Sequence, residues 1–264
     1  MSRIQSILKS KNLDFLILGI ADFKLSQLDL PNVIPHELPT NLRLGHLAEK
    51  VVSILIKTSR NYNVLHENVQ IIDNKKTIGE LDFIVKELQT NKITHIELAY
   101  KFYLYDPIIS KVEIHNWIGP NRNDTLKQKV EKLTSRQFPL LYDDRTAATL
   151  DSLEIDQISQ SNCFLASLYL PYQHETDISP MYRKAIVGYY LDLETFKSIA
   201  DYTKTKSYYV PIKTEWGMDP SEHKSWLSYS EVIFKISDSL GQKQSVLCWC
   251  KAGDHYESFF VVWW

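Results

Sequence analysis

A short run in the first half of the chain, GELDFIV at residues 79–85, carries acidic residues in a pattern that can bind a cation. Because side chains alternate along a strand, Glu80 and Asp82 share one face, and Leu81 and Phe83 take the other. Asp82 interrupts an otherwise apolar strand, which indicates a role beyond packing. Glu80 is a supporting residue nearer the end of the strand.

A second run, HIELAYK at residues 95–101, repeats this arrangement, with His95, Glu97, Ala99 and Lys101 on one face. If the two strands are antiparallel neighbours, each presents a carboxylate to the same site. Two carboxylates a few ångströms apart repel each other and are costly to desolvate, so a fold keeps them when a cation neutralises both. Oxygen ligands suit Mg²⁺ or Mn²⁺, whose waters can attack a phosphate.

One helix and three strands must position these residues. The apolar spacing from Leu44 predicts an amphipathic helix to about Thr58, with Glu49 at the margin of its apolar stripe. Before it, the proline-containing segment 30–41 predicts a connection after a short N-terminal helix. Runs rich in β-branched residues predict strands at 64–72, 78–85 and 93–103. A further helix is predicted over 124–138, with Asn123 or Asp124 as its N-cap and Pro139 just beyond its end.

The order of a helix with Glu49, then GELDFIV, a turn and HIELAYK resembles the PD-(D/E)xK nuclease superfamily over about residues 44–136. More closely, the whole chain resembles a bacterial family called domain of unknown function eighteen fifty-three. This second resemblance is carried by GELD, ELAYKFYL, WIGPNR at residues 117–122 and the aromatic C-terminus. The family has no established activity, so the resemblance implies a fold more directly than a function.

The superfamily resemblance implies roles for particular residues. Asp82 and Glu97 would bind the metal ion, with the main-chain carbonyl of Leu98, and Glu49 would act through water or a second metal ion. The superfamily's lysine usually stands two residues after the acidic ligand. Here that position is Ala99, and Lys101 lies nearly 7 Å further along the strand at ~3.3 Å per residue. A lysine stem spans roughly 6 Å, so Lys101 can reach back toward the metal-bound water, with the help of a bulge.

Basic residues that follow suggest contacts with phosphate. The turn at Gly119–Arg122 precedes a helix, so its N–H groups and the Arg122 guanidinium could bind an anion, although such loops are more often plain turns. Lys129, Lys132 and Arg136 share one face of the following helix. That face could track nucleic acid, and a solvated helix surface is the plainer alternative.

The last hundred residues predict strands at 163–170, 185–191, 208–212, 232–236, 245–251 and 258–264, and a helix at 193–202 capped by Asp192. The aromatic residues of this part could stack on bases but are better explained as sheet core. Cys248 and Cys250 share a strand face near His255. Their spacing differs from that of structural zinc sites, and buried thiols are the preferred interpretation.

Composition limits the function classes. The chain has 264 residues, 44% of them apolar, enough for one large or two ordinary domains, and we expect a nuclease-like domain at 1–145 and a β-rich unit at 146–264. The net charge of -2 removes the argument from general basicity for nucleic-acid binding. Three cysteines and the absence of a signal peptide or membrane-length apolar stretch predict a soluble cytoplasmic protein; the oligomeric state is left open.

We therefore expect an α/β or α+β fold: a PD-(D/E)xK restriction-endonuclease-like mixed sheet flanked by helices, with a β-rich C-terminal part. The leading function is a Mg²⁺-dependent nuclease, or one using Mn²⁺, that hydrolyses phosphodiester bonds in DNA or RNA. The alternative is a catalytically inactive nuclease-like fold that binds nucleic acid or protein. A phosphohydrolase acting on nucleotides or other small molecules is a third hypothesis.

Overall fold

A computed structural model describes residues 2–15, 19–34, 37–39, 41–150, 153–173, 177–199 and 206–264. The chain forms two compact units. We name them the carboxylate unit, Asn12–Tyr100 with Gln128–Leu165, and the aromatic unit, Met1–Lys11 with Lys101–Lys127 and Ala166–Trp264. Strands β5 (Ile93–Tyr105) and β7 (Ser159–Pro171) supply residues to both. The predicted division near residue 145 stays a prediction about domain organisation.

The carboxylate unit is built on consecutive antiparallel strands. β3 (Tyr62–Asp73) pairs with β4 (Lys76–Glu87), which pairs with β5, and β7 is the next strand in the order. Asn74 and Lys75 join β3 to β4 with positive φ angles of 46° and 66°, as a two-residue hairpin turn requires. The short strand β2 (Ala21–Asp22) lies parallel to β7, and β1 (Lys11–Asn12) also pairs with β7. The three strands predicted for this region are confirmed.

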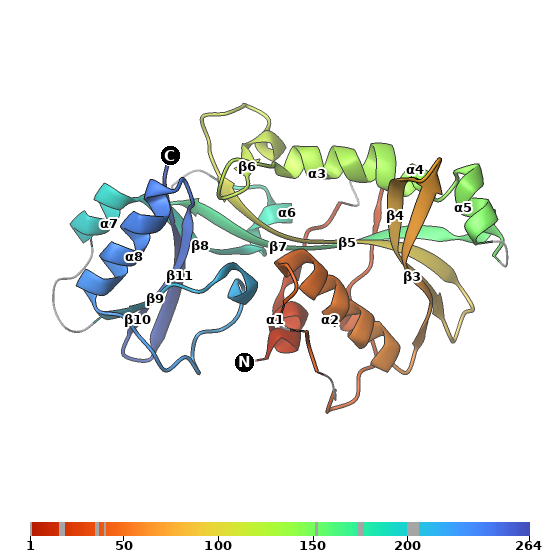
Figure 1. The fold of residues 1–264 in the computed structure, drawn as a ribbon, viewed down its shortest axis with the longest axis horizontal. Coiled ribbons are helices and arrows are strands. Elements are labelled where there is room, and N and C mark those ends of the chain that lie inside the picture. The colour runs from red at the N-terminus through yellow and green to blue at the C-terminus, as the bar shows by residue number, and fades with distance from the viewer. Residues whose placement is uncertain are drawn as a thin grey trace. The chain divides into compact units, whose positions relative to one another are not determined.

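Helix α2 (Leu44–Thr58) confirms the predicted amphipathic helix. Its apolar positions Leu47, Ala48, Val51, Val52 and Leu55 are all buried. Figure 1 shows α2 on one side of the strands and the segment around α4 on the other. Burial of one apolar stripe therefore fixes which way the polar margin of the helix, including Glu49, is turned.

The helix predicted at 124–138 forms as three segments: α3 (Leu126–Lys132), a π-helical turn at Leu133–Gln137, and α4 (Phe138–Leu140). Pro139 lies in the first turn of α4, where its missing N–H costs little, and not beyond the helix end as predicted. The chain continues into α5 (Asp144–Thr149), capped by Asp143. The π turn was not predicted, and it bears directly on the site below.

The aromatic unit contains β8 (Ile186–Asp192), β9 (Lys206–Tyr209), β10 (Val246–Ala252) and β11 (His255–Val262), in the order β7-β8-β11-β10-β9. β7, β8 and β11 run parallel, while β10 is antiparallel to both of its neighbours. Gly188 is required where β8 meets β11, because a Cβ there would lie 2.0 Å from the carbonyl oxygen of Ser258. Mixed sheet and helices together confirm the predicted α/β character.

Helices α7 (Leu193–Ile199) and α8 (Tyr229–Gly241) contribute to one core of this unit. The Asp192 cap of α7 is confirmed by the bond from the Thr195 N–H to Oδ1 at 2.7 Å. Tyr202, at the predicted end of that helix, lies outside the described residues, as does Pro35 of the predicted connection.

The strand predicted at 232–236 is wrong, because these residues form the middle of α8. Val232 and Ile236 are buried and four residues apart, whereas Phe234 between them is 79% exposed, which is a helical spacing and not a strand alternation. Ser228 and Glu231 form a capping box that begins the helix. This start signal was in the sequence and was overlooked.

The remaining elements are short: α1 (Arg3–Lys9), β6 (Trp117–Ile118), α6 (Pro180–Arg183) and 3₁₀ turns at Leu25–Gln27, Glu113–Asn116, Ile155–Gln157 and Lys213–Glu215. Helix α1 confirms the predicted N-terminal helix. Within the described part of the chain, no helix combines the length and apolarity needed to cross a bilayer.

Candidate functional site

The structure brings Asp82 and Glu97 together in the carboxylate unit. The ladder between β4 and β5 runs from Lys86 opposite Ile93 to Phe83 opposite Ile96, and the two acidic residues are the next on each strand. Asp82 Oδ2 accepts a hydrogen bond of 2.7 Å from the main-chain N–H of Leu98. The predicted pairing of two strand carboxylates is therefore present in the fold.

Burial makes this pair costly to ionise. It raises the pKa of Asp82 to about 8, assisted by the nearby charges of Glu97 and Glu49 and opposed by the Leu98 N–H and by Lys129. Burial likewise raises the pKa of Glu97 to about 8, while Lys129 and a main-chain hydrogen bond with Asp82 lower it. Two adjacent carboxyl groups that resist ionisation are the electrostatic signature of a site suited to a cation.

Both carboxylate oxygens of Glu97 accept hydrogen bonds from neutral side chains. His95 Nε2 lies 2.9 Å from Glu97 Oε1, and the side chains of both residues are fully buried. The Gln137 amide donates to Glu97 Oε2. Because a carboxylate that accepts at both oxygens is stabilised as the anion, these two donors oppose the effect of burial.

The protonation of His95 follows from its other partner. Gln160 donates its amide to His95 Nδ1 at 3.2 Å and to the Phe138 carbonyl at 2.8 Å. Nδ1 must therefore accept, which places the ring proton on Nε2, where it is directed at Glu97. Burial lowers the pKa of His95 to about 4, so the ring is neutral at physiological pH.

The π turn places Lys129 in the same network. Its ammonium donates to Gln137 Oε1 at 2.8 Å, and the amide of Gln137 in turn donates to Glu97. In a regular α-helix, residues about seven apart lie above one another, and the extra residue of a π turn extends this separation to eight. Lys129 and Gln137 thus share a face because of the π turn, and the lysine charge reaches Glu97 through an amide.

Glu49 borders the pair from α2. It raises the pKa of Asp82, and its Oε2 lies 2.9 Å from His46 Nδ1. It also lines a hollow of about 240 Å³ together with Ser53 and Glu67. Glu80 acts electrostatically on Glu97 and raises its pKa, in keeping with a supporting position. The predicted acidic residues are thus assembled in one unit.

Lys101 is held elsewhere. It belongs to the aromatic unit, where its ammonium donates to Asp124 Oδ2 at 2.7 Å. Asp124 also packs against Gly119, since a Cβ on that glycine would meet Asp124 Oδ1 at 2.1 Å. A role for Lys101 in catalysis stays a prediction, and the lysines that act on the carboxylates within their own unit are Lys129 and Lys132.

The loop at residues 119–122 is held by contacts with other parts of the aromatic unit. Its Arg122 N–H bonds the Gly119 carbonyl at 2.8 Å, and the Arg122 guanidinium pairs with Asp106 and lies 4.1 Å from the centre of the Trp264 ring. Asn121 Oδ1 accepts from the Ser245 N–H at 2.8 Å. These bonds anchor the C-terminal strands and fit the plain-turn interpretation; the phosphate contact at Arg122 stays a prediction.

Of the three basic residues predicted to share one helix face, Lys132 and Arg136 lie together, whereas Lys129 bonds Gln137 across the π turn. Lys132 and Arg136 line a hollow of about 580 Å³ with the polar residues Gln128, Glu131, Thr134 and Ser135. Lys132 also lowers the pKa of Glu97, so this face and the carboxylates share one electrostatic environment.

The donor set fits a divalent cation in part. Asp82 Oδ1 accepts no hydrogen bond from the described residues, so one hard oxygen is available beside a second carboxylate. Glu97 already has a hydrogen bond on each oxygen, so an ion there must exchange with a donor. Among the described residues, no three His, Cys, Asp or Glu side chains cluster closely enough to hold a metal ion by themselves. A cation here would therefore be held by Asp82 and Glu97 together with a main-chain carbonyl and water.

Sequence reasoning missed the residues that surround Glu97. His95 was placed on the correct face without a role, while Gln137 and Gln160 were not singled out. A buried glutamate needs donors, which is a signal that hydrogen-bonding residues must converge on it. Nothing in the sequence identified Gln137 as one of them, because regular helical spacing does not align it with Lys129.

The C-terminal candidates are explained by packing. Cys163, Cys248 and Cys250 are buried free thiols, and burial raises the pKa of each thiol group. Tyr208 and Trp216 are buried in the core as predicted. Trp249 is partly exposed.

A comparison with family models identifies the family of the chain. The model of the family described as domain of unknown function (DUF1853) matches residues 20–258, and the chain belongs to this family. No curated protein and no solved structure matches the chain. The carboxylate pair and its hydrogen bonds are therefore the basis for a functional proposal.

Proposed function

We propose that the carboxylate unit is a nuclease-like PD-(D/E)xK unit that hydrolyses phosphodiester bonds in DNA or RNA with Mg²⁺ or Mn²⁺. The observation that carries the proposal is the buried pair Asp82 and Glu97, whose pKa values burial raises to about 8. A fold that merely needed hydrogen bonds here would not retain two adjacent acids, because their ionisation opposes folding. A cation removes that cost.

Each residue then has a defined part. Asp82, Glu97 and the Leu98 carbonyl would hold the ion, and Glu49 would contact it through water or hold a second ion. A bound divalent ion supplies an activated water and neutralises phosphate charge. His95 and Gln137 orient the Glu97 carboxylate. Lys129 can transfer its hydrogen bond from Gln137 to a phosphate oxygen and stabilise negative charge that develops there.

Calorimetric titration with Mn²⁺ tests the ion site. Wild type is expected to bind, and the double variant Asp82→Asn with Glu97→Gln is expected to lose binding while keeping side-chain size. Asp156→Asn is the matched control, because Asp156 is an exposed acid of the same unit. Negligible heat in wild type and in the double variant alike would contradict the metal-site proposal.

Cleavage assays test the chemistry. Nicking of plasmid DNA and degradation of a structured RNA are measured with Mg²⁺ and with Mn²⁺. Lys129→Met is expected to reduce the rate about 100-fold or more, as for loss of a charged group that acts in the transition state. The cleavage rate of Lys101→Ala is measured in parallel, because Lys101 is the lysine that the family resemblance implies. Equal activity of wild type and the double carboxylate variant would overturn the proposal.

A second function is a nuclease-like unit that binds nucleic acid without cleaving it. Two observations favour it: both oxygens of Glu97 are hydrogen-bonded, and Lys101 is paired with Asp124. Retention of labelled DNA or RNA with no cleavage in either metal, and loss of retention on Arg136→Gln, would select this function over the enzyme.

A further inference from the structure

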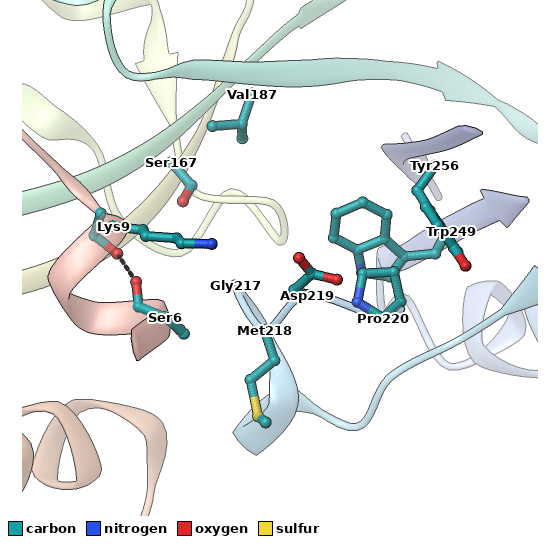
Figure 2. Close-up of a pocket in the computed structure, with 11 residues that line it drawn as sticks. Ser6, Lys9, Ser167, Val187, Gly217, Met218, Asp219, Pro220, Trp249 and Tyr256 are labelled. Atoms are coloured by element: carbon teal, nitrogen blue, oxygen red, sulfur yellow. Dashed lines mark hydrogen bonds between the residues drawn. The ribbon is translucent and has the colours of Figure 1, made fainter. Parts of the chain in front are cut away.

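The aromatic unit contains a hollow of about 360 Å³ built entirely from its own residues (Figure 2). The last turn of α1 forms one wall through Lys9, and the loop Gly217–Pro220 forms another. Ser167 of β7 and the rings of Trp249 and Tyr256, from β10 and β11, complete it. A hollow of this volume is within the range of small-molecule sites.

The walls are fixed by contacts that do not involve a ligand. The buried guanidinium of Arg3 on α1 donates to the carbonyl of Trp216 at 2.7 Å and to that of Thr214. Trp216 packs edge-on against Phe102 and Phe260, with ring centres 5.4 and 5.0 Å apart. The chain then turns at Gly217, whose φ of 79° favours glycine. A pocket held in shape in this way loses little entropy on binding.

Opposite charges face this hollow. Asp219 Oδ1 accepts from the Ser221 N–H at 2.9 Å, and the hydrogen bonds from Ser221 lower the pKa of Asp219, so the group is ionised. Lys9 adds to this effect through its charge, yet its ammonium forms no hydrogen bond or ion pair with the described residues. In Figure 2, the Lys9 ammonium, the Asp219 carboxylate and the Ser167 hydroxyl are directed into the hollow.

The third wall is aromatic. Trp249 and Lys251 project from the face of β10 opposite to the core residues Cys248 and Cys250. The Trp249 side chain is partly exposed, and Figure 2 shows its indole along one side of the hollow. An exposed indole beside unpaired charges is suited to a planar ring that also carries polar groups.

We propose that this pocket binds a purine nucleoside monophosphate. The base stacks on Trp249, its ring-edge N–H donors face Asp219, and the phosphate meets Lys9 and the Ser167 hydroxyl. A guanine edge offers a carboxylate two N–H donors, whereas adenine offers one amino group, so the guanine nucleotide binds more tightly. The pocket functions independently of cation binding in the carboxylate unit.

Calorimetry on the full chain tests the pocket with GMP, AMP, guanosine and inorganic phosphate. GMP is expected to bind most tightly. Asp219→Asn keeps the acceptor for Ser221 but removes the charge, and it is expected to weaken GMP binding ~10-fold or more. Lys9→Gln is expected to weaken GMP but not guanosine. Lys184→Gln and Asp254→Asn, at exposed positions of the same unit, are the matched controls and are expected to bind as wild type.

A second calorimetric comparison distinguishes a free nucleotide from the end of a nucleic-acid strand as the ligand. Tighter binding of a 5′-phosphorylated guanosine dinucleotide than of GMP assigns the pocket to the end of a nucleic-acid strand, and the reverse assigns it to a free nucleotide. Either result supports the site. The proposal is overturned if GMP does not bind at millimolar concentration, if inorganic phosphate binds as tightly as GMP, or if the control variants lose binding as much as Asp219→Asn does.

Discussion

Two pairs of acidic residues, one in each unit, differ in how their charge is balanced. In the aromatic unit, buried Asp106 pairs directly with the Arg122 guanidinium, and Asp124 accepts from the Lys101 ammonium at 2.7 Å. Asp106 and Asp124 thus each have a cation of their own. The guanidinium is fixed further by the Trp264 ring, so that this cluster is complete without any other partner.

Around Asp82 and Glu97 in the carboxylate unit, the side-chain and main-chain donors that touch the two acids are neutral. Asp82 accepts from a peptide N–H, and Glu97 accepts from His95 and Gln137. Lys129 acts on Glu97 through the amide of Gln137. A carboxylate that is paired directly with a cation needs no further partner. Neutral donors orient a carboxylate but do not neutralise its charge, so it can still bind a cation. This contrast is the physical reason to look for a cation beside Asp82 and Glu97 and not beside Asp106 and Asp124.

The largest effect is expected from removing the cation of the Asp106–Arg122 pair. Arg122→Ala leaves the Asp106 carboxylate buried without its cation, and we expect a loss of about 3 kcal/mol of unfolding free energy. Urea unfolding measures it. Arg183→Ala is the control, because Arg183 and Asp177 form an exposed pair, with side chains 52% and 88% exposed. An exposed pair contributes at most about 1 kcal/mol. Equal losses in the two variants would remove the distinction between the clusters.

The second effect is a pH dependence of the unbalanced pair. The pKa values of Asp82 and Glu97 are raised to about 8 in the folded chain, so folding takes up protons at pH values where the unfolded acids are ionised. Stability without metal therefore falls as pH rises from the unfolded pKa of about 4 through the folded pKa of about 8, and it levels off about one pH unit above that; pH 6.5 to 8 covers part of this fall. A window of 1.5 pH units corresponds to about 2 kcal/mol per retained proton. His95 is neutral in the folded chain over this range, since its folded pKa is about 4; in the unfolded chain it is about half protonated at pH 6.5, so it opposes the fall only at the lower end of the range.

Unfolding in urea at a series of pH values, with and without Mn²⁺, measures this slope. The double variant Asp82→Asn with Glu97→Gln is expected to remove most of it, and Mn²⁺ is expected to flatten it in wild type by replacing the protons. A slope that persists unchanged in the double variant would assign it to other groups.

The third effect concerns the amide between Lys129 and Glu97. Gln137→Leu removes a donor from a buried carboxylate, and we expect a loss of about 1–3 kcal/mol above pH 8, where Glu97 is ionised. At pH 6.5 the loss is smaller, because protonated Glu97 needs fewer donors. Urea unfolding at both pH values measures the difference. Gln242→Leu is the control, since Gln242 is exposed at the end of α8.

Much of this arrangement could be predicted from the sequence, because it follows from local periodicity. Strand alternation placed Asp82 and Glu97 on their strands, and the apolar stripe of α2 placed Glu49 at its margin. The Gln137 contact could not be predicted, because it depends on a π turn that local helical rules do not specify. Helix α8 could be predicted from local signals, since its capping box and the four-residue spacing of Val232 and Ile236 are both present in the sequence. Long-range pairings such as Gln160 with His95, 65 residues apart, depend on tertiary packing.

The smallest effect separates the two ways in which a lysine can act on Glu97. Lys132 lowers the pKa of Glu97 from an exposed position, so its influence passes through solvent and is screened by salt. We expect Lys132→Gln to raise the pKa of Glu97 by a few tenths at low ionic strength and to have no effect near 1 M salt. Lys129→Met is expected to raise it more and to keep most of its effect in salt, because Lys129 acts through the hydrogen bond to Gln137. A carboxyl NMR titration of Glu97 in both variants measures the two shifts. If salt removes them equally, the Gln137 amide does not transmit the charge of Lys129, and Glu97 depends on general electrostatics alone.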